Sequence, residues 1–195
     1  MRRVTVVRHG NTFDPGETVR RVGRGTDLPL SRSGRVQADA LAAHFSKVRF
    51  DRILSSPLLR TRQTAEAIAA PVIFDDRLLE IDYGPDEGQP EAAVVARLGQ
   101  AVLDRWDEDA VPPRDWLVDP DSVRADWRAL LAESEGETLI VTSNGIARFL
   151  LDVAAHDGAV QSGLGRKLKT GAYGVVEETK GGWRIVSWSV RPRPR

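Results

Sequence analysis

The residues with the clearest chemical potential stand at the end of the first apolar run of the chain. Arg8, His9 and Gly10 directly follow residues 4–7, and the glycine lets the backbone turn sharply toward a ligand. A neutral imidazole can act as a nucleophile or a general base. The neighbouring guanidinium disfavours protonation of the ring and is also a fork-shaped receptor for phosphate. A nucleophilic nitrogen beside a phosphate receptor indicates phosphoryl transfer.

A second group of polar residues follows a later apolar run, residues 138–143. Asn144 and Gly145 come next and begin a predicted helix. Free backbone N–H groups at a helix N-terminus attract anions, although an asparagine is also a common N-cap there. Arg60, four residues after Ser56, lies in the first turn of another predicted helix. Its position alone is equally compatible with phosphate binding and with a surface role.

An acidic loop punctuated by glycine supplies the candidate proton donor. Glu80 and Asp82 lie in the stretch "LLEIDYGPDEG". A carboxyl group held next to a leaving oxygen can protonate it. A loop of this composition standing alone would be typical of a solvated surface, so the role of Glu80 depends on its neighbours in the fold.

Alternating strands and helices must position these groups. Apolar runs predict strands over residues 4–7, 52–56, 72–74 and 138–143, and a closing hairpin over 171–178 and 183–190. Helices are predicted over residues 33–46, from Pro57 onward, over 90–107 and 119–133, and from Asn144 onward. For the second of these, Ser56 is the predicted N-cap and Pro57 the first helical residue.

This alternation predicts an α/β fold with three layers, α/β/α, and a mostly parallel central sheet. Ligands of such sheets bind beyond the carboxyl ends of the strands, so we expect residues 8–10, 55–56 and 143–145 to meet in one crevice. We expect a single domain over residues 1–190. A small helical cap is predicted over about residues 85–135, packed by Trp106, Trp116 and Trp127, with a disordered tail over 191–195.

Composition excludes several classes of function. Lys+Arg and Asp+Glu each number 28, so no net charge favours nucleic acid or an anionic membrane. The chain has no cysteine, which excludes disulfides and cysteine-ligated metals and fits a reducing compartment. The first apolar run is too short for a signal peptide or a membrane span. We expect a cytoplasmic protein with a small phosphorylated substrate, without nucleic acid or membrane partners; the sequence leaves its oligomeric state open.

Five ordered segments of this sequence resemble the histidine phosphatase superfamily, also called the phosphoglycerate mutase-like family. They lie between residues 6 and 150, within a resemblance that extends from residue 4 to about residue 178. They read "VVRHGNT", "DLPLSRSGRVQA", "ILSSPLLRTRQTAEAI", "LLEIDYGPDEG" and "IVTSNGIARFL". The resemblance implies that His9 is the nucleophile that becomes phosphohistidine and that Arg8 and Arg60 bind the phosphoryl oxygens. It implies that Glu80 protonates the leaving group and later activates water. It implies neither a metal nor an organic cofactor.

The resemblance also suggests substrate contacts, with one departure among them. The family often has an arginine between its first two motifs, a place that Arg20, Arg21 or Arg24 could fill here. The family's asparagine a few residues after Arg-His-Gly has no counterpart, and Asn11 is a partial substitute. Asn11, Thr12 and Arg21 are therefore the candidate substrate contacts.

A second departure concerns the phosphoryl group itself, because Asn144 stands where the family has its second histidine. With Gly145 it can still donate hydrogen bonds to phosphate, but it cannot carry a positive charge. The leading hypothesis is a phosphomonoester hydrolase, and the alternative is a phospholigand-binding protein with weak or no turnover. Retention of Glu80 favours the enzyme, since a pure binder has little use for a proton donor. A phosphoglycerate-type mutase, or a protein phosphatase with an open crevice, is less favoured.

Overall fold

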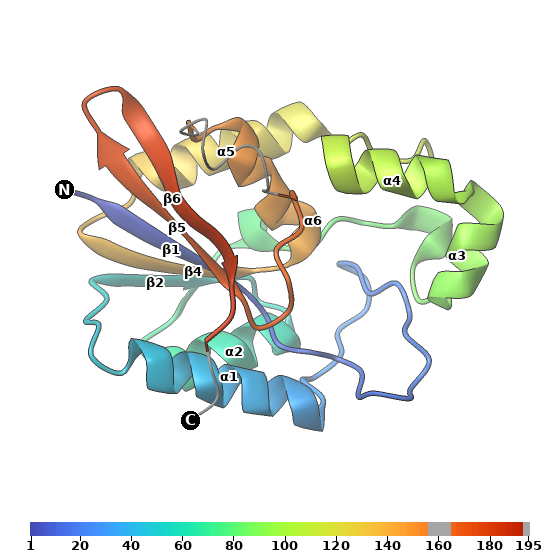
Figure 1. Cartoon of the computed structure of the whole chain (residues 1–195), viewed down its shortest axis with the longest axis horizontal. Helices are drawn as coiled ribbons and strands as arrows, with labels where there is room; N and C mark the ends of the chain where they lie inside the picture. The colour runs from blue at the N-terminus through green and yellow to red at the C-terminus, as the bar shows by residue number, and fades with distance from the viewer. Residues whose placement is uncertain (156–164, 193–195) are drawn as a thin grey trace.

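The computed structural model describes residues 1–155 and 165–192, in which six strands form one sheet in the order β3-β2-β4-β1-β5-β6 (Figure 1). The strands are β1 (Arg3–Arg8), β2 (Arg52–Ser55), β3 (Ile73–Phe74), β4 (Glu137–Thr142), β5 (Tyr173–Thr179) and β6 (Gly182–Val190). β1, β2, β3 and β4 are parallel, and β5 pairs antiparallel with both β1 and β6. The predicted mostly parallel sheet with a closing hairpin is confirmed.

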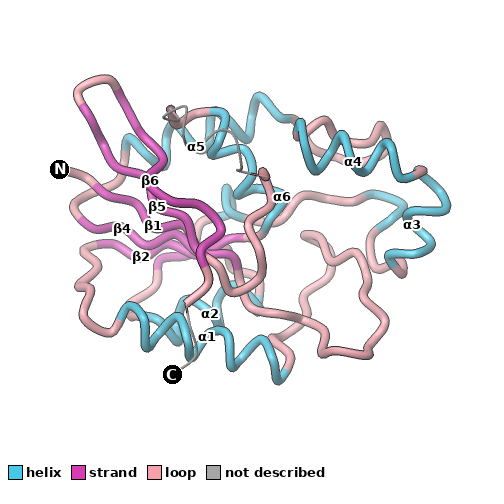
Figure 2. Tube along the Cα trace, viewed as in Figure 1, coloured by secondary structure: helices cyan, strands magenta, loops and turns pink. Residues whose placement is uncertain are grey.

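Helices cover both faces of this sheet (Figure 2). On one face lie α1 (Arg32–Phe45) and α2 (Leu59–Ile68); on the other lie α5 (Pro120–Ala132), α6 (Asn144–Ala147) and the 3₁₀ helix Arg148–Asp152. α3 (Glu91–Leu98) and α4 (Gln100–Asp109) lie to one side, beyond the carboxyl end of β1. Of the range predicted as a cap, residues 85–135, α3 and α4 therefore stand apart from the sheet, whereas α5 packs over it.

The continuous apolar run of β1 reflects burial on both faces of the sheet. Val4 and Val6 belong to the cluster that contains Trp127 of α5, while Val7 belongs to the cluster that contains Leu41 of α1. A strand between two helical layers needs apolar side chains in both directions, so it does not alternate with polar residues. In the described residues, no helix is both long and apolar enough to cross a bilayer.

The prediction of Ser56 as an N-cap is wrong, because α2 begins later, at Leu59. The Ser56 N–H donates to Val141 O at 3.1 Å, which continues the pairing of β2 with β4 past the end of the strand. The chain then turns through two residues before it becomes helical. The Leu59 N–H donates to Asp27 Oδ1 at 2.6 Å, so a carboxylate far away in sequence supplies the acceptor at this helix start.

Two other predicted helices are divided or shortened. The single helix over residues 90–107 is wrong because Gly99, with φ of 82°, separates α3 from α4; this backbone conformation is one that glycine adopts freely. The helix after Asn144 is α-helical only to Ala147 and continues as a 3₁₀ helix. All three predicted cap tryptophans are buried, but the Trp127 indole N–H donates to Ile146 O at 2.9 Å and so joins α5 to α6.

Candidate active site

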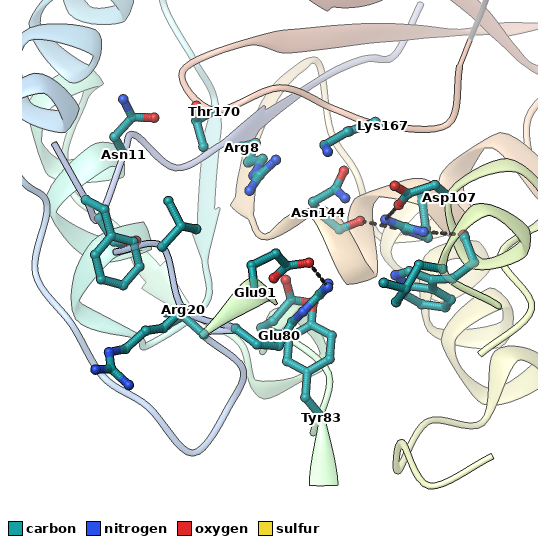
Figure 3. A pocket seen from close by; sticks show the side chains of 18 of the residues that line it. Arg8, Asn11, Arg20, Glu80, Tyr83, Glu91, Asp107, Asn144, Lys167 and Thr170 are labelled. Atoms are coloured by element: carbon teal, nitrogen blue, oxygen red, sulfur yellow. Dashed lines mark hydrogen bonds and ion pairs between the residues drawn. The ribbon is translucent and has the colours of Figure 1, made fainter. Parts of the chain in front are cut away.

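A cavity of about 490 Å³ opens at the carboxyl ends of β1 and β4 (Figure 3). Its walls come from the loop after β1, the loop around Glu80, the facing sides of α3 and α4, the start of α6 and residues 167–170. The first and third of the predicted strand-end groups meet here. The second does not, because Ser55 and Ser56 are fully buried away from the cavity and the Ser55 hydroxyl donates to Ser56 O at 2.9 Å.

His9 lines this cavity as a buried, neutral imidazole. Its Nδ1–H donates to Gly10 O at 2.7 Å, because a carbonyl can only accept, and this leaves the lone pair on Nε2. Burial holds the pKa of His9 well below 6.5, and the charges of Arg60 and Arg8 lower this pKa further. The ring is therefore deprotonated at neutral pH and can act as a nucleophile.

The loop that carries His9 is fixed by two of the sequence motifs. The Gly10 N–H donates to Thr64 Oγ1 at 3.2 Å, and the Asn11 N–H donates to Gln37 Oε1 at 2.8 Å. A side chain at Gly10 would collide with the Gly34 carbonyl, so the loop lies directly on the start of α1. The motifs "SGRVQA" and "RQTA" therefore supply the groups that hold the nucleophile in place.

The charges of Arg8 and Arg60 lower the pKa of His9, and each of these arginines has one N–H group without a hydrogen-bond partner in the described residues. Arg8 Nη1 donates to Leu168 O at 2.9 Å, while Arg60 Nη1 and Nη2 donate to Thr26 O and Gly23 O at 2.8 and 3.0 Å. The Nε–H of both arginines is buried and has no hydrogen-bond partner in the described structure. A buried unpaired donor is costly, so each group fits a site that receives an anion. Arg8 lines the cavity, whereas Arg60 is not among the lining residues. Burial lowers the pKa of Arg8 to about 10, which leaves it charged at neutral pH.

Glu80 is buried beside these cations and is held by two backbone donors. The Ile81 N–H donates to Oε1 at 2.9 Å and the Gly145 N–H donates to Oε2 at 3.1 Å. The Glu80 charge opposes the lowering of the Arg8 and Arg60 pKa values by burial. The Gly145 N–H, which we predicted to bind phosphate, instead orients the carboxyl group in this structure.

Asn144 lines the cavity with its side-chain amide in a defined orientation. Its Oδ1 accepts a hydrogen bond from the Leu168 N–H at 2.9 Å. Within the described residues its Nδ2 group has no hydrogen bond, and donation from this group to a phosphate stays a prediction. Unlike a protonated imidazole, this side chain adds no charge to the site.

The candidate substrate contacts differ in how freely they face the cavity. Asn11 and Thr12 both line it, but Asn11 Nδ2 donates to Ser33 Oγ at 3.1 Å and is engaged with α1. Arg20 also lines it and extends away from Arg8 in Figure 3.

Arg21 lines the same cavity but is held by three groups of the surrounding wall. It forms an ion pair with Glu91 and lies over the rings of Tyr83 and Trp116, at 5.2 and 5.1 Å from their centroids. Arg24, the third candidate between the first two motifs, is not part of the cavity lining. Arg21 therefore reaches a substrate only as part of this cluster.

Several cavity residues were not anticipated from the sequence. Arg148 is buried over the Trp106 ring, 4.0 Å from its centroid, and donates to Asp107 Oδ1 at 3.2 Å. Lys167 and Thr170 come from a segment with no strand-end or helix-start signal. Of the other histidines, the exposed His44 ring packs on Phe45 and Tyr173, 4.8 and 5.0 Å between centroids, and His156 lies outside the described residues.

The chain is thus an α/β protein with three layers, which has a neutral histidine, two arginines and a carboxylate near its strand ends. It belongs to the histidine phosphatase superfamily (branch 1), whose family model matches residues 4–191. The resemblance noted from the five sequence segments is thereby confirmed.

Relatives and solved structures within this family include phosphatases and a mutase-like protein. The chain is 42% identical to fructose-2,6-bisphosphatase TIGAR of Xenopus tropicalis over 104 residues, which is 48% of this chain and only 38% of that protein. It is 33% identical over 156 residues to the probable phosphoglycerate mutase GpmB of Proteus mirabilis, covering 75% and 71% of the two chains. A mycobacterial glucosyl-3-phosphoglycerate phosphatase superposes with a TM-score of 0.80 at 25% identity, covering 98% of this chain and all of that one. That enzyme has also been solved with inorganic phosphate.

Proposed function

We propose that this chain is a phosphomonoester hydrolase that works through a phosphohistidine at His9. One observation carries the proposal. His9, a buried neutral imidazole with its lone pair on Nε2, lines the cavity together with Arg8. The charges of Arg8 and Arg60 both act on His9, and in the described residues each of the two arginines has a buried Nε–H without a partner. This combination offers a nucleophile and a charged receptor for the same phosphoryl group. The phosphate complex of the mycobacterial relative agrees with a phosphorylated ligand.

The reaction then proceeds in two steps. Arg8 and Arg60 bind the phosphoryl oxygens, His9 Nε2 forms a bond to phosphorus, and the bond from phosphorus to the leaving oxygen breaks as Glu80 donates a proton to that oxygen. Gly10 O, which accepts from Nδ1–H, stabilises the positive charge that develops on the ring. Water next attacks phosphorus, Glu80 takes up a proton from it, and the nitrogen–phosphorus bond breaks to release phosphate.

The cavity lining contributed by α3 and α4 favours a small substrate over a folded protein. Glu91 and Val95 of α3 and Leu103 and Trp106 of α4 line the cavity, which leaves less room for a folded protein substrate than an open crevice would. A mutase would return the phosphoryl group to an organic acceptor, and a pure phospholigand-binding protein would form no phosphoenzyme. The cytoplasmic location remains a prediction from the absence of cysteine.

The direct test incubates the purified full chain with a generic aryl phosphate and follows both products. We expect release of phenol and inorganic phosphate, and an acid-labile, base-stable phosphoenzyme after rapid quenching. Phenol release with transfer of phosphate to an added alcohol in place of water would support a mutase. Phosphate binding without phenol release or phosphoenzyme would leave only the binding function.

Arg60→Ala is expected to lower kcat/KM about tenfold to a hundredfold and to weaken inhibition by inorganic phosphate, because charge-assisted hydrogen bonds to the phosphoryl group are lost. Steady-state kinetics and phosphate inhibition measure both effects. Arg62→Ala is the matched control, since Arg62 lies on the same helix, is exposed and forms an ion pair with Glu66 at 3.8 Å. Equal kinetics for the Arg60 and Arg62 variants, with both folded by thermal melting, would remove Arg60 from the phosphate site.

Gly145→Ala tests whether the backbone must leave room for the proton donor. A Cβ at this position would lie 3.0 Å from Glu80 Cδ and closer still to Oε1, so the carboxyl group must move. We expect turnover of alkyl phosphates to fall by about tenfold or more, since catalytic groups tolerate little displacement. Gly181→Ala, in the turn between β5 and β6 where a Cβ meets only Thr179 at 4.0 Å, should be unaffected. Unchanged kinetics in a well-folded Gly145→Ala protein would contradict the placement of Glu80.

A further inference from the structure

The segment at residues 167–170 is bound to both sides of the phosphoryl site through one residue. Leu168 O accepts from Arg8 Nη1 at 2.9 Å, and the Leu168 N–H donates to Asn144 Oδ1 at 2.9 Å. The Leu168 side chain is fully buried, which fixes this backbone against the core. The residue before Leu168 therefore has a defined position next to Arg8, at the end of β1, and Asn144, just after β4.

That residue is Lys167, and it lines the cavity. Its side chain extends toward Arg8 and Asn144 in Figure 3. Two other cations of the cavity wall are neutralised by acids, Arg21 by Glu91 and Arg148 by Asp107. Within residues 1–155 and 165–192, no carboxylate lies within ion-pair distance of Lys167, so its charge is not neutralised there by an acid of the protein.

The hydrogen bond between Leu168 and Asn144 disfavours a charged histidine at position 144. A cation on this side of the phosphoryl site therefore has to come from another residue. The Leu168 N–H points at Asn144 Oδ1 and requires an acceptor at that place. A protonated imidazole carries hydrogen on both nitrogens and has no acceptor to offer. A charged histidine at this position would therefore meet an unpaired N–H, whereas the asparagine amide matches it.

We propose that Lys167 is the additional cation of the phosphoryl site, and that Asn144 anchors the segment that presents it; this inference rests on the proposed phosphatase function. The ammonium group would contact the non-bridging phosphoryl oxygens from the side of the cavity on which Asn144 lies. As a compact point charge with three donors, it suits a phosphoryl group whose charge shifts during transfer. Lysine and asparagine together thus perform the work of one charged histidine.

Lys167→Ala is expected to lower kcat/KM for a singly phosphorylated aryl substrate by about tenfold or more, through loss of a charge-assisted bond to the phosphoryl group. Inhibition by orthovanadate, which adopts the five-coordinate geometry of phosphoryl transfer, should weaken by a similar factor. Lys167→Arg should retain most of the activity, because it restores a cation. Lys169→Ala is the matched control: Lys169 is exposed like Lys167, its N–H donates to Ser189 Oγ at 3.0 Å, and its side chain does not line the cavity.

A double-mutant cycle tests the role given to Asn144. If Asn144 acts by holding Lys167 in place, Asn144→Ala should cost much less in the Lys167→Ala background than in the wild type, because the two changes remove one interaction. Fully additive losses would show that Asn144 acts independently of Lys167 and would overturn the anchoring role.

Binding measurements separate this inference from the proposed function. Calorimetric titration of the full chain with orthovanadate reports on the phosphoryl site even without turnover, so an inactive wild type refutes the hydrolase while leaving Lys167 testable. Vanadate affinity that is equal in wild type, Lys167→Ala and Lys169→Ala would overturn the inference. So would a Lys167→Ala loss confined to substrates with a second anionic group, because Lys167 would then bind the leaving portion.

Discussion

Replacing His9 with alanine is expected to lower turnover of an aryl phosphate by roughly 10⁴-fold or more, because loss of a covalent nucleophile removes the only route through a phosphoenzyme. Among the described residues that line the cavity, the Nε2 lone pair of the neutral ring has no substitute, since the other side-chain nitrogens belong to arginines, a lysine, amides and the Trp106 indole. Initial rates and acid-labile phosphoenzyme should disappear together. The matched control is His44→Ala, which removes an exposed imidazole on α1 that packs on Phe45 and Tyr173 and does not line the cavity.

His9→Ala, which lowers turnover, is expected to make the folded protein more stable relative to the wild type at acidic pH. His9 has a pKa well below 6.5 in the folded protein and near 6.5 when unfolded, so unfolding takes up a proton once the pH falls below that value. His9 therefore costs the wild type stability as the pH decreases, and His9→Ala lacks this cost. The melting temperature of His9→Ala, measured relative to that of the wild type, should therefore increase as the pH is lowered from about 7.5 to about 5.5. Wild-type rates in a folded His9→Ala sample would refute the covalent mechanism.

The fold was predictable wherever a local pattern determines the structure. β1 and β4 have apolar side chains in both directions because they lie between two helical layers, and a buried strand followed by glycine or asparagine is visible in the sequence alone. The start of α2 was not predictable in this way. Its first N–H is paired with Asp27, so the carboxylate and the N–H come together only after the loop between them has folded.

In the candidate site, too, residues marked by a local sequence pattern were predicted, and residues placed by contacts between distant segments were missed. His9 and Arg8 were identified because strand ends of a parallel sheet converge. Lys167 was missed because its placement depends on Leu168, whose two hydrogen bonds reach residues 160 and 24 positions away in sequence. The contact between Gly145 and Glu80 was missed for the same reason, since it spans 65 positions.

Glu80→Gln is expected to lower turnover of an alkyl phosphate by about 10²- to 10⁴-fold, and that of an aryl phosphate with an acidic phenol far less, because a proton donor matters most when the departing oxygen is basic. Glutamine preserves the shape but has only one oxygen, so one of the Ile81 and Gly145 N–H groups loses its acceptor. This structural loss affects both substrates, whereas loss of the proton donor depends on the leaving group. Comparing kcat for the two substrates on the same variant measures the difference.

Glu87→Gln provides the control that isolates chemistry from structure. Glu87 also accepts two backbone N–H groups, from Gly23 at 2.9 Å and from Tyr83 at 3.4 Å, but it does not line the cavity. Loss of a structural acceptor should therefore affect both substrates equally and weakly in that variant. If Glu80→Gln also reduced both substrates by one factor, its carboxyl group would only orient the site and the proton would come from elsewhere. A loss that increases with the pKa of the leaving alcohol is the result that assigns proton donation to Glu80.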